Sequence, residues 1–234
     1  MNGINIFEYL QTDHPWFDTK NYTTLQIWLF SIGASLWLVA YTFTIRNAWQ
    51  RMKQNRTLDI PVTAVVLNFG CEISTSIFFV PNMGNALVLA YWLWMVFDIF
   101  IVIAMFRVGR EQFTMPQIRN NFSLILMLGL VISFIVQCTF ILQYDLPMAP
   151  LDSYVINLVM SILFINLFFA EGPSGYSKTV AWSKFLGTGI ISVMFYSKYP
   201  GNNFLTALYI SCALFDILYI CLLYKKEKNS PAVA

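Results

Sequence analysis

Seven apolar segments, separated by short polar breaks, account for most of the chain. They cover about residues 24–46, 59–81, 85–107, 120–144, 151–171, 179–198 and 203–224. Each holds roughly the 20 apolar residues that a helix needs to cross a bilayer, where backbone groups must find partners within the segment. Breaks such as Asp145-Leu146-Pro147 contain turn-forming residues. The pattern predicts an all-α, polytopic membrane protein built as a bundle of seven transmembrane helices.

The first 23 residues differ from the rest in having mixed polarity. Phe7, Tyr9, Trp16 and Phe17 alternate with acids, and a signal peptide's basic start and cleavage site are missing. We expect residues 1–23 to lie along the outer interface as a short amphipathic helix or loop. No repeat or linker divides the chain, so residues 1–234 are predicted to form a single membrane domain.

Composition and charge support a membrane protein and predict its orientation. The chain is 58% hydrophobic and 11% charged, and its net charge of +2 is too small to suggest a nucleic-acid partner. Of the 14 Lys and Arg, 11 flank one set of segment ends, Lys20 and Lys198 flank the other, and Lys184 lies inside the sixth segment. Positive charge stays cytoplasmic, so we expect the N-terminus outside and the C-terminus in the cytoplasm. A bacterial inner membrane or a eukaryotic endomembrane suits such a chain.

Three acids lie near the middle of the predicted bundle, at a depth in the bilayer where a charged side chain is energetically unfavourable. Asp98 and Asp216 each precede the basic end of their segment by nine residues, and Glu72 precedes Pro81 by nine. Nine residues of helix correspond to roughly 13 Å, which places all three acids near one middle layer. Ionisable groups at this depth usually face the bundle interior and mark function.

The helical neighbours of the three acids predict an acidic pocket lined by aromatic rings. Residues three, four or seven apart share a helix face. No metal site is expected, because the only histidine, His14, lies in the N-terminal segment and no clustered carboxylate motif is present. The face partners are Asn68 for Glu72, Tyr91 and Trp94 for Asp98, and Tyr209 and Tyr219 for Asp216.

Buried acids of this kind suit more than one chemistry. A carboxyl group in apolar surroundings favours its neutral form, as a general acid requires, and a chain of acids can also relay protons in a transporter. The plainer interpretation is structural, with each acid hydrogen-bonded to Asn68, to a Ser or Thr hydroxyl, or to Lys184. The residues alone leave these alternatives open.

Five motifs in order resemble those of one family, the small integral-membrane terpene cyclases of fungal meroterpenoid and indole-diterpene biosynthesis, which have bacterial relatives. The match covers essentially the whole chain. The sequence departs from the family pattern at Cys71, where Trp is expected, at Lys184, where Arg is expected, and at Glu171-Gly172, where Arg-Gly is common. The motifs are Leu67–Glu72 (LNFGCE), Arg107–Glu111 (RVGRE), Gly172–Ser177 (GPSGYS), Trp182–Thr188 (WSKFLGT) and Phe215-Asp216.

The resemblance implies a cyclase that needs no metal and no cofactor. The family's catalytic carboxylates carry over to Glu72 and Asp216. Our own hypothesis is that one of them donates the proton and the other is its hydrogen-bonded partner, with Asp98 as a supporting acid or final base. The donor would protonate a terminal alkene or epoxide of a prenylated, lipophilic substrate taken from the bilayer. Asn68 would orient Glu72. Residues expected to bind substrate and stabilise the cation are Asn68, Tyr91, Trp94, Trp182, Tyr209 and Tyr219.

Other functions fit less well. A retinal protein needs a Schiff-base lysine in the last segment, which has none between Asn203 and Tyr224. A proton-coupled small-solute transporter suits the buried acids, but the internal repeats of such carriers are missing. A carotenoid end-group cyclase would keep the mechanism and change the substrate.

Overall fold

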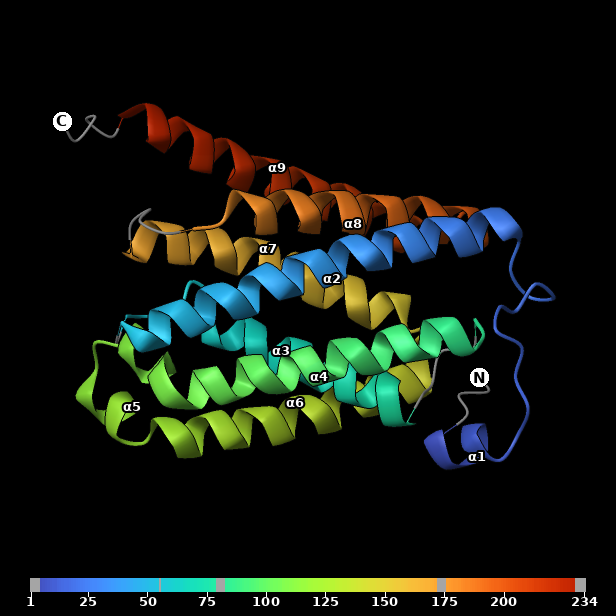
Figure 1. Ribbon diagram of the computed structural model, residues 1–234, viewed down its shortest axis with the longest axis horizontal. Coiled ribbons are helices and arrows are strands. Elements are labelled where there is room, and N and C mark those ends of the chain that lie inside the picture. The colour runs from blue at the N-terminus through green and yellow to red at the C-terminus, as the bar shows by residue number, and fades with distance from the viewer. Residues whose placement is uncertain (1–4, 55, 79–82, 172–175, 230–234) are drawn as a thin grey trace.

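The computed structural model describes residues 5–54, 56–78, 83–171 and 176–229, and the regular elements within these ranges are all helices (Figure 1). The predicted all-α class is therefore confirmed for the described residues. The elements are α1 (Ile6–Leu10), α2 (Thr24–Lys53), α3 (Val62–Ile73), the π-helical η1 (Ser74–Phe78), α4 (Asn85–Val108), the 3₁₀ turn η2 (Gly109–Gln112), α5 (Pro116–Asn120), α6 (Phe122–Tyr144), α7 (Pro150–Glu171), α8 (Lys178–Lys198) and α9 (Asn203–Asn229).

Five helices in the described residues are long and apolar enough to cross a membrane. They are α2, α4 with η2, α6, α7 and α9. The apolar stretch of α3 and η1, Val62–Phe78, is shorter, and α8 is not among the five. Each predicted segment thus contains a helix, whereas the length and apolarity of a complete span are found in five. Residues 79–81, which end the second predicted segment, and residues 172–175 of the Gly172–Ser177 motif lie outside the described residues.

Helix α2 is longer than the segment 24–46 that the apolar pattern predicts. Thr23 caps its start, because the Thr23 hydroxyl accepts from the Gln26 backbone N–H at 3.2 Å and the Gln26 side chain accepts from the Thr23 N–H at 3.0 Å. Arg51 and Lys53 lie in its last turn, where positive charge favours the helix dipole. Polar residues therefore extend the helix beyond its apolar part.

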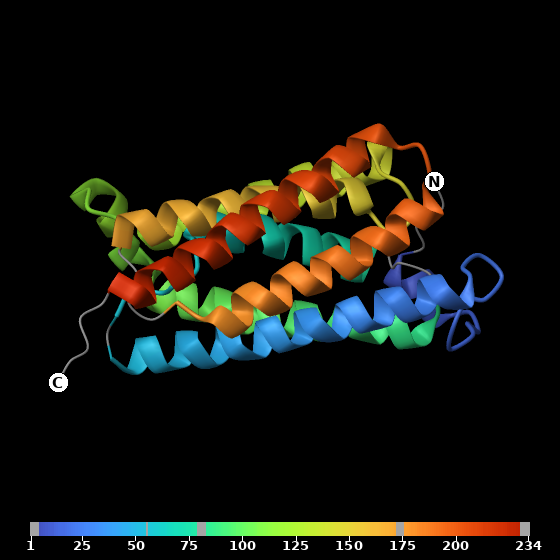
Figure 2. The same ribbon diagram turned by 90° about the horizontal axis from the view of Figure 1, so that it is seen from above.

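Five helices form a ring around the interior of the bundle. Helix α2 packs against α4 and α8, while α3 packs against α4 and α7. Side-chain hydrogen bonds join α7 to α8, including one of 2.8 Å between Tyr154 Oη and Ser192 Oγ. Helix α6 packs outside α3, and α9 packs outside α7 and α8 (Figures 1 and 2). The space enclosed by α2, α3, α4, α7 and α8 is where a site can form.

Two glycines let α2 and α8 approach closely on one side of this ring. A Cβ at Gly33 would lie 2.8 Å from the Gly187 carbonyl oxygen, and a Cβ at Gly187 would lie 3.0 Å from the Gly33 carbonyl oxygen. Small residues at such crossings are typical of helices packed in membranes. The contact fixes α8 against α2 next to Trp37, whose Cδ1 would be 2.9 Å from a Cβ at Gly187.

The N-terminal segment covers one end of the bundle. The short helix expected within residues 1–23 is α1, with Asn5 as its N-cap. Three backbone hydrogen bonds then join residues 15–18 to residues 83–86, among them Asp18 N–H to the Met83 carbonyl at 2.9 Å. Gly84 has a φ of +102°, and a Cβ there would lie 2.6 Å from the Trp16 carbonyl oxygen. Only glycine fits this crossing without strain.

Candidate active site

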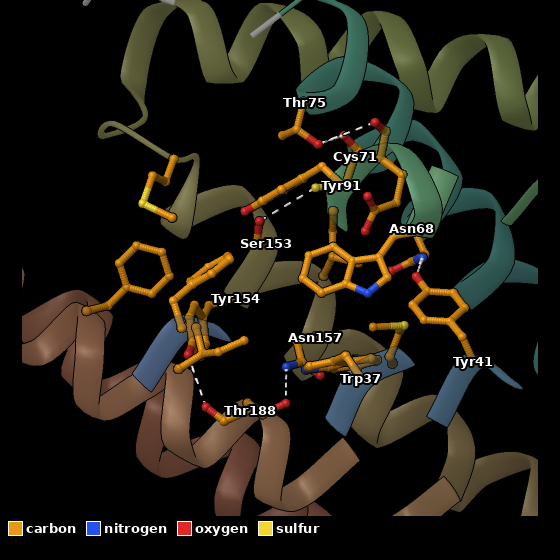
Figure 3. A pocket seen from close by; sticks show the side chains of 18 residues that line it. Trp37, Tyr41, Asn68, Cys71, Thr75, Tyr91, Ser153, Tyr154, Asn157 and Thr188 are labelled. Atoms are coloured by element: carbon orange, nitrogen blue, oxygen red, sulfur yellow. Dashed lines mark hydrogen bonds between the residues drawn. The ribbon is translucent and has the colours of Figure 1, made fainter. Parts of the chain in front are cut away.

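An interior cavity of about 90 Å³ lies within the ring of helices (Figure 3). On the same scale a single water molecule needs about 10–15 Å³. Seven aromatic side chains line it, together with Glu72 and a few neutral polar groups. One acid and several aromatic rings thus share a cavity, whereas Asp98 and Asp216, which were expected in the same pocket, do not line it. The aromatic residues are Phe30, Trp37, Tyr41, Tyr91, Trp94, Tyr154 and Phe195.

Glu72 is the acid that reaches this cavity. Its Oε2 atom is buried and has no hydrogen-bond partner among the described residues. Burying a polar atom without a partner is costly, and each such atom in a native structure calls for an explanation. The structural explanation considered for the three acids, a satisfied hydrogen bond, does not account for this oxygen.

A change of helix type positions Glu72. Helix α3 ends at Ile73, one residue after Glu72, and the chain continues as the π-helical η1. Hydroxyls support this transition, because Ser74 donates to the Gly70 carbonyl at 2.7 Å and Thr75 donates to the Cys71 carbonyl at 2.9 Å. Single π turns within helices are frequent at functional sites. Sequence periodicity assumes 3.6 residues per turn and cannot predict this change.

Asp98 forms a hydrogen-bonded group with two neighbours on other helices. The Asn68 amide donates to Asp98 Oδ2 and to Tyr41 Oη, both at 2.7 Å, and Tyr41 donates to Asp98 Oδ2 at 3.4 Å. Asn68 was expected to orient Glu72, but these hydrogen bonds of its amide go to Asp98 and Tyr41. The three residues join α2, α3 and α4. Asp98 Oδ2, Asn68 Nδ2 and Tyr41 Oη are bonded to one another, in contrast to Glu72 Oε2, which has no partner among the described residues.

Replacing Asn68 should show how much the hydrogen bonds among Tyr41, Asn68 and Asp98 contribute to the stability of the fold. In Asn68→Leu, Asp98 and Tyr41 lose their strongest partner, and we expect the free energy of unfolding to fall by about 1–3 kcal/mol. Tyr41→Phe is the matched comparison, since it removes one hydroxyl and leaves the bond between Asn68 and Asp98, and should cost about 1 kcal/mol. Unfolding in detergent, followed by tryptophan fluorescence, measures both. Equal stability of Asn68→Leu and the wild type would contradict the assignment.

A second cavity, of about 60 Å³, adjoins the first on the far side of this group. Asp98 and Lys184 line it, while Glu72 lines the first cavity. Trp37, Tyr41, Asn68 and Met160 line both and so form the wall between them. Glu72 and Asp98 therefore lie on opposite sides of one wall, with Asn68 and Tyr41 in it.

Asp216 occupies a different environment, in a buried ion pair. Lys184 Nζ lies 2.6 Å from Asp216 Oδ1 and 2.9 Å from Oδ2, and the Ser161 hydroxyl donates to Oδ1 at 2.7 Å. Lys184 and Asp216 are 6% and 4% exposed. The group joins α7, α8 and α9, and Asp216 lines neither of the two cavities. The structure thus brings Glu72 close to the group of Asp98, while Asp216 faces a lysine.

The residues predicted to bind substrate divide into two sets. Tyr91 and Trp94 line the first cavity, with their rings 5.0 Å apart and edge to face, and Asn68 lines both cavities. Trp182 is 40% exposed and donates to the Tyr224 hydroxyl at 3.3 Å. Tyr219 packs among Phe164, Phe168 and Tyr176, and Tyr209 packs on Tyr154. Trp182, Tyr209 and Tyr219 line neither of the two cavities.

Several lining residues were missed from the sequence. Tyr41 and Trp37 on α2 and Asn157 on α7 all line the first cavity. A signal for Asn157 was available, because Ser153, Asn157 and Ser161 recur every four residues in an apolar helix and so share one face. Tyr41 and Trp37 also share a face, but nothing in the sequence identifies this face as the inner one.

Comparisons with known proteins agree with the geometry of a lipophilic, acid-bearing cavity. Residues 18–229 match the profile of a family described as Pyr4-like transmembrane terpene cyclases. The Pyr4-family terpene cyclase mfmH of Annulohypoxylon moriforme is 24% identical over 227 residues, which cover 89% of this chain and 90% of that protein. No solved structure is significantly similar to the chain.

Proposed function

Since the chain belongs to the Pyr4-like transmembrane terpene cyclases, we propose that it folds and cyclises a prenyl chain by proton transfer from Glu72. The observation that carries the proposal is the Glu72 carboxyl group in an aromatic cavity, where its buried Oε2 lacks a partner. A terminal epoxide oxygen or alkene of the substrate supplies the missing partner. The position of this carboxyl group in the cavity and its burial among aromatic rings suit a general acid.

The proposed reaction is an isomerisation. Glu72 gives its proton to the epoxide oxygen, whose bond to the more substituted carbon breaks, or to the terminal alkene, and the resulting carbocation is attacked by successive alkenes of the same chain. The final cation loses a proton to water or to a carboxylate such as the one left on Glu72, so one proton is given and one is returned and the mass of the substrate is unchanged. Neither oxidation nor reduction occurs at any step.

The aromatic lining has two tasks in this proposal. Faces of Trp and Tyr rings attract a cation within about 6 Å of their centroids, so they stabilise positive charge as it moves along the folded chain. The same side chains exclude water, which would otherwise capture the cation before cyclisation is complete. Tyr91 and Trp94 carry this role among the residues expected from the sequence, with Trp37 and Tyr41 beside them.

The three acids have separate roles. Asp98 lies behind the wall of Asn68 and Tyr41, where it holds the wall in place and serves as a supporting acid for Glu72. Asp216 was expected to share proton transfer with Glu72, but both its oxygens are engaged by Lys184. Its role in the proposal is to balance the charge of Lys184 and to hold α7, α8 and α9 together.

Seven helices cross the bilayer in this proposal, with the N-terminus outside. Figure 1 supports the orientation, because the basic ends of α2, α4 and α9 lie at the end of the bundle opposite α1. With the chain expressed in a bacterial inner membrane, an impermeant thiol reagent should label Lys20→Cys in intact spheroplasts and Lys53→Cys only after permeabilisation. Both side chains are exposed. The reverse labelling would overturn the orientation.

The activity itself is tested with membranes from cells that express the chain. Farnesylated and geranylgeranylated aromatics, with and without terminal epoxides, are incubated with these membranes. Products of unchanged mass and fewer alkenes support the cyclase. Proton-coupled uptake into proteoliposomes without such products would favour a transporter, which the family match does not favour, and cyclised carotenoid end groups would change the substrate class.

A further inference from the structure

Proton transfer in the proposed cyclisation leaves Glu72 as a carboxylate. The reaction begins with a proton from Glu72 at one end of the folded chain and ends with proton loss from a carbon atom elsewhere on that chain. The proton therefore leaves at a different place from the one at which it entered, and Glu72 needs a new one. Water must stay away from the cation in the first cavity, so a route through side chains suits this return.

The second cavity has the size and the polar groups to hold water. Its volume of about 60 Å³ compares with about 10–15 Å³ for a single water molecule. Hydrogen-bonding groups line it, and these can bind water from more than one side. They include the side chains of Tyr41, Thr44, Asn68 and Asp98. The second cavity can thus be wet while the first stays dry.

The second cavity lies toward the end of the bundle that carries most of the basic residues. Its lining includes Thr44 in the second half of α2, Ile60 just before α3, and Val180 in the first turn of α8. The first cavity is lined instead by Phe30, in the first half of α2, and by Phe195, in the last turn of α8. In the proposed orientation the second cavity is therefore the one nearer the cytoplasm.

Asp98 and Tyr41 connect the two cavities. Asp98 lines the second cavity, Tyr41 lines both, and Tyr41 Oη lies 3.4 Å from Asp98 Oδ2. A phenolic hydroxyl and a carboxyl group can each accept and donate a proton. The Asn68 amide holds both oxygen atoms at 2.7 Å. Glu72 follows Asn68 by four residues on α3, so the two share a helix face beside the first cavity.

We propose that Asp98 and Tyr41 form a proton relay that restores Glu72 after each turnover. This inference rests on the proposed cyclase function and adds two relay residues to it. Water in the second cavity protonates Asp98, which then donates to Tyr41 Oη, while Tyr41 passes its own proton to the Glu72 carboxylate. The last proton of the cyclisation ends in water. One proton is thus released and one is taken up in each turnover, and no charge accumulates.

The test measures how quickly the donor recovers. Purified protein is mixed with one equivalent of a prenylated epoxide, and a second equivalent follows after a varied delay. The fast phase of the second cyclisation reports the fraction of Glu72 that has regained its proton. In Asp98→Asn, whose amide oxygen still accepts from Asn68, recovery should become at least about tenfold slower relative to the first turnover than in the wild type. Tyr41→Phe should have the same effect.

A purely structural role for Asp98 or Tyr41 would not give this result. Loss of folded protein lowers the amount of product in both turnovers and leaves the ratio of recovery rate to first-turnover rate unchanged. Tyr196→Phe is the matched control, because Tyr196 is an exposed tyrosine that lines neither of the two cavities, and it should keep the wild-type ratio. If added product lengthens the slow recovery of the variants, product release causes the delay and the relay is wrong.

The remaining outcomes separate this inference from the proposed function. If the wild type cyclises no prenylated epoxide, the proposed function fails and the relay fails with it. If the wild type cyclises and both variants recover as fast as the wild type, the cyclase stands and the relay is overturned. If Asp98→Asn does not fold, Tyr41→Phe, which keeps the ring that packs on Phe97, decides alone. Loss of the first turnover itself in folded Tyr41→Phe would also overturn the relay.

Discussion

Glu72→Gln should lower the rate of cyclisation by about 10²–10⁴-fold, the range that general acid catalysis contributes. Glutamine keeps the size and the hydrogen-bonding capacity of the side chain but has no proton acidic enough to give to an epoxide or alkene. Since Glu72 Oε2 has no protein partner to lose, the free energy of unfolding should change by no more than about 1 kcal/mol. Product formation and detergent unfolding measure the two effects.

Glu72→Asp is the control for this first prediction. It retains an acid but withdraws it by one methylene from the cavity, so we expect activity between that of the wild type and that of Glu72→Gln. A Glu72→Gln protein that cyclises at a rate near the wild type would remove Glu72 from the role of donor. A Glu72→Gln protein that unfolds would mean that the carboxyl group is structural after all.

The second large effect is expected at the ion pair of Lys184 and Asp216. Asp216→Asn leaves a buried, uncompensated Lys184, and Lys184→Met leaves a buried, uncompensated Asp216. Breaking a buried pair from one side costs about 3–5 kcal/mol. Each single variant should therefore lose stability, and with it activity, although neither residue lines the cavity of Glu72. Unfolding in detergent and product yield are the measurements.

The double variant Lys184→Met, Asp216→Asn should recover most of the lost stability. Replacing both members of a buried pair removes the uncompensated charge and is often neutral. The amide oxygen that replaces the carboxylate in Asp216→Asn would still accept from the Ser161 hydroxyl, which keeps α7 joined to α9. Additive losses in the double variant, with no recovery, would show that the two residues do not act as a pair.

Much of the fold could be predicted from the sequence, because the apolar segments are bounded by turn residues. The segment predicted as 85–107 corresponds to α4 (Asn85–Val108), and the one predicted as 179–198 corresponds to α8 (Lys178–Lys198). The polar extension of α2 to Lys53 and the π-helical η1 could not be predicted from the sequence. An apolar pattern does not record hydrogen bonds of caps or of Ser and Thr hydroxyls to the backbone.

The sequence predicted which residue types form the site, but it did not predict which side chains each of the three acids contacts. Glu72, Asp98 and Asp216 all lie within the bundle as expected, but which side chains they meet depends on how helices neighbour one another. Lys184 was considered as a structural partner for the acids, and the structure assigns it to Asp216. Sharing a helix face with an acid proved insufficient for Tyr219, which turns toward Phe168 and Tyr176.

The central claim is that Glu72 donates the proton and that Asp216 has a structural role. A single-turnover measurement tests it most directly. Wild type, Glu72→Gln and the double variant Lys184→Met, Asp216→Asn are each mixed in excess with one prenylated epoxide, so that chemistry is followed without product release. We predict at least about a hundredfold slower cyclisation for Glu72→Gln, and a rate much closer to that of the wild type for the folded double variant, because neither of its two changed residues lines the cavity of Glu72. Rapid cyclisation by Glu72→Gln, or none by a folded double variant, would contradict the assignment of the proton donor to Glu72.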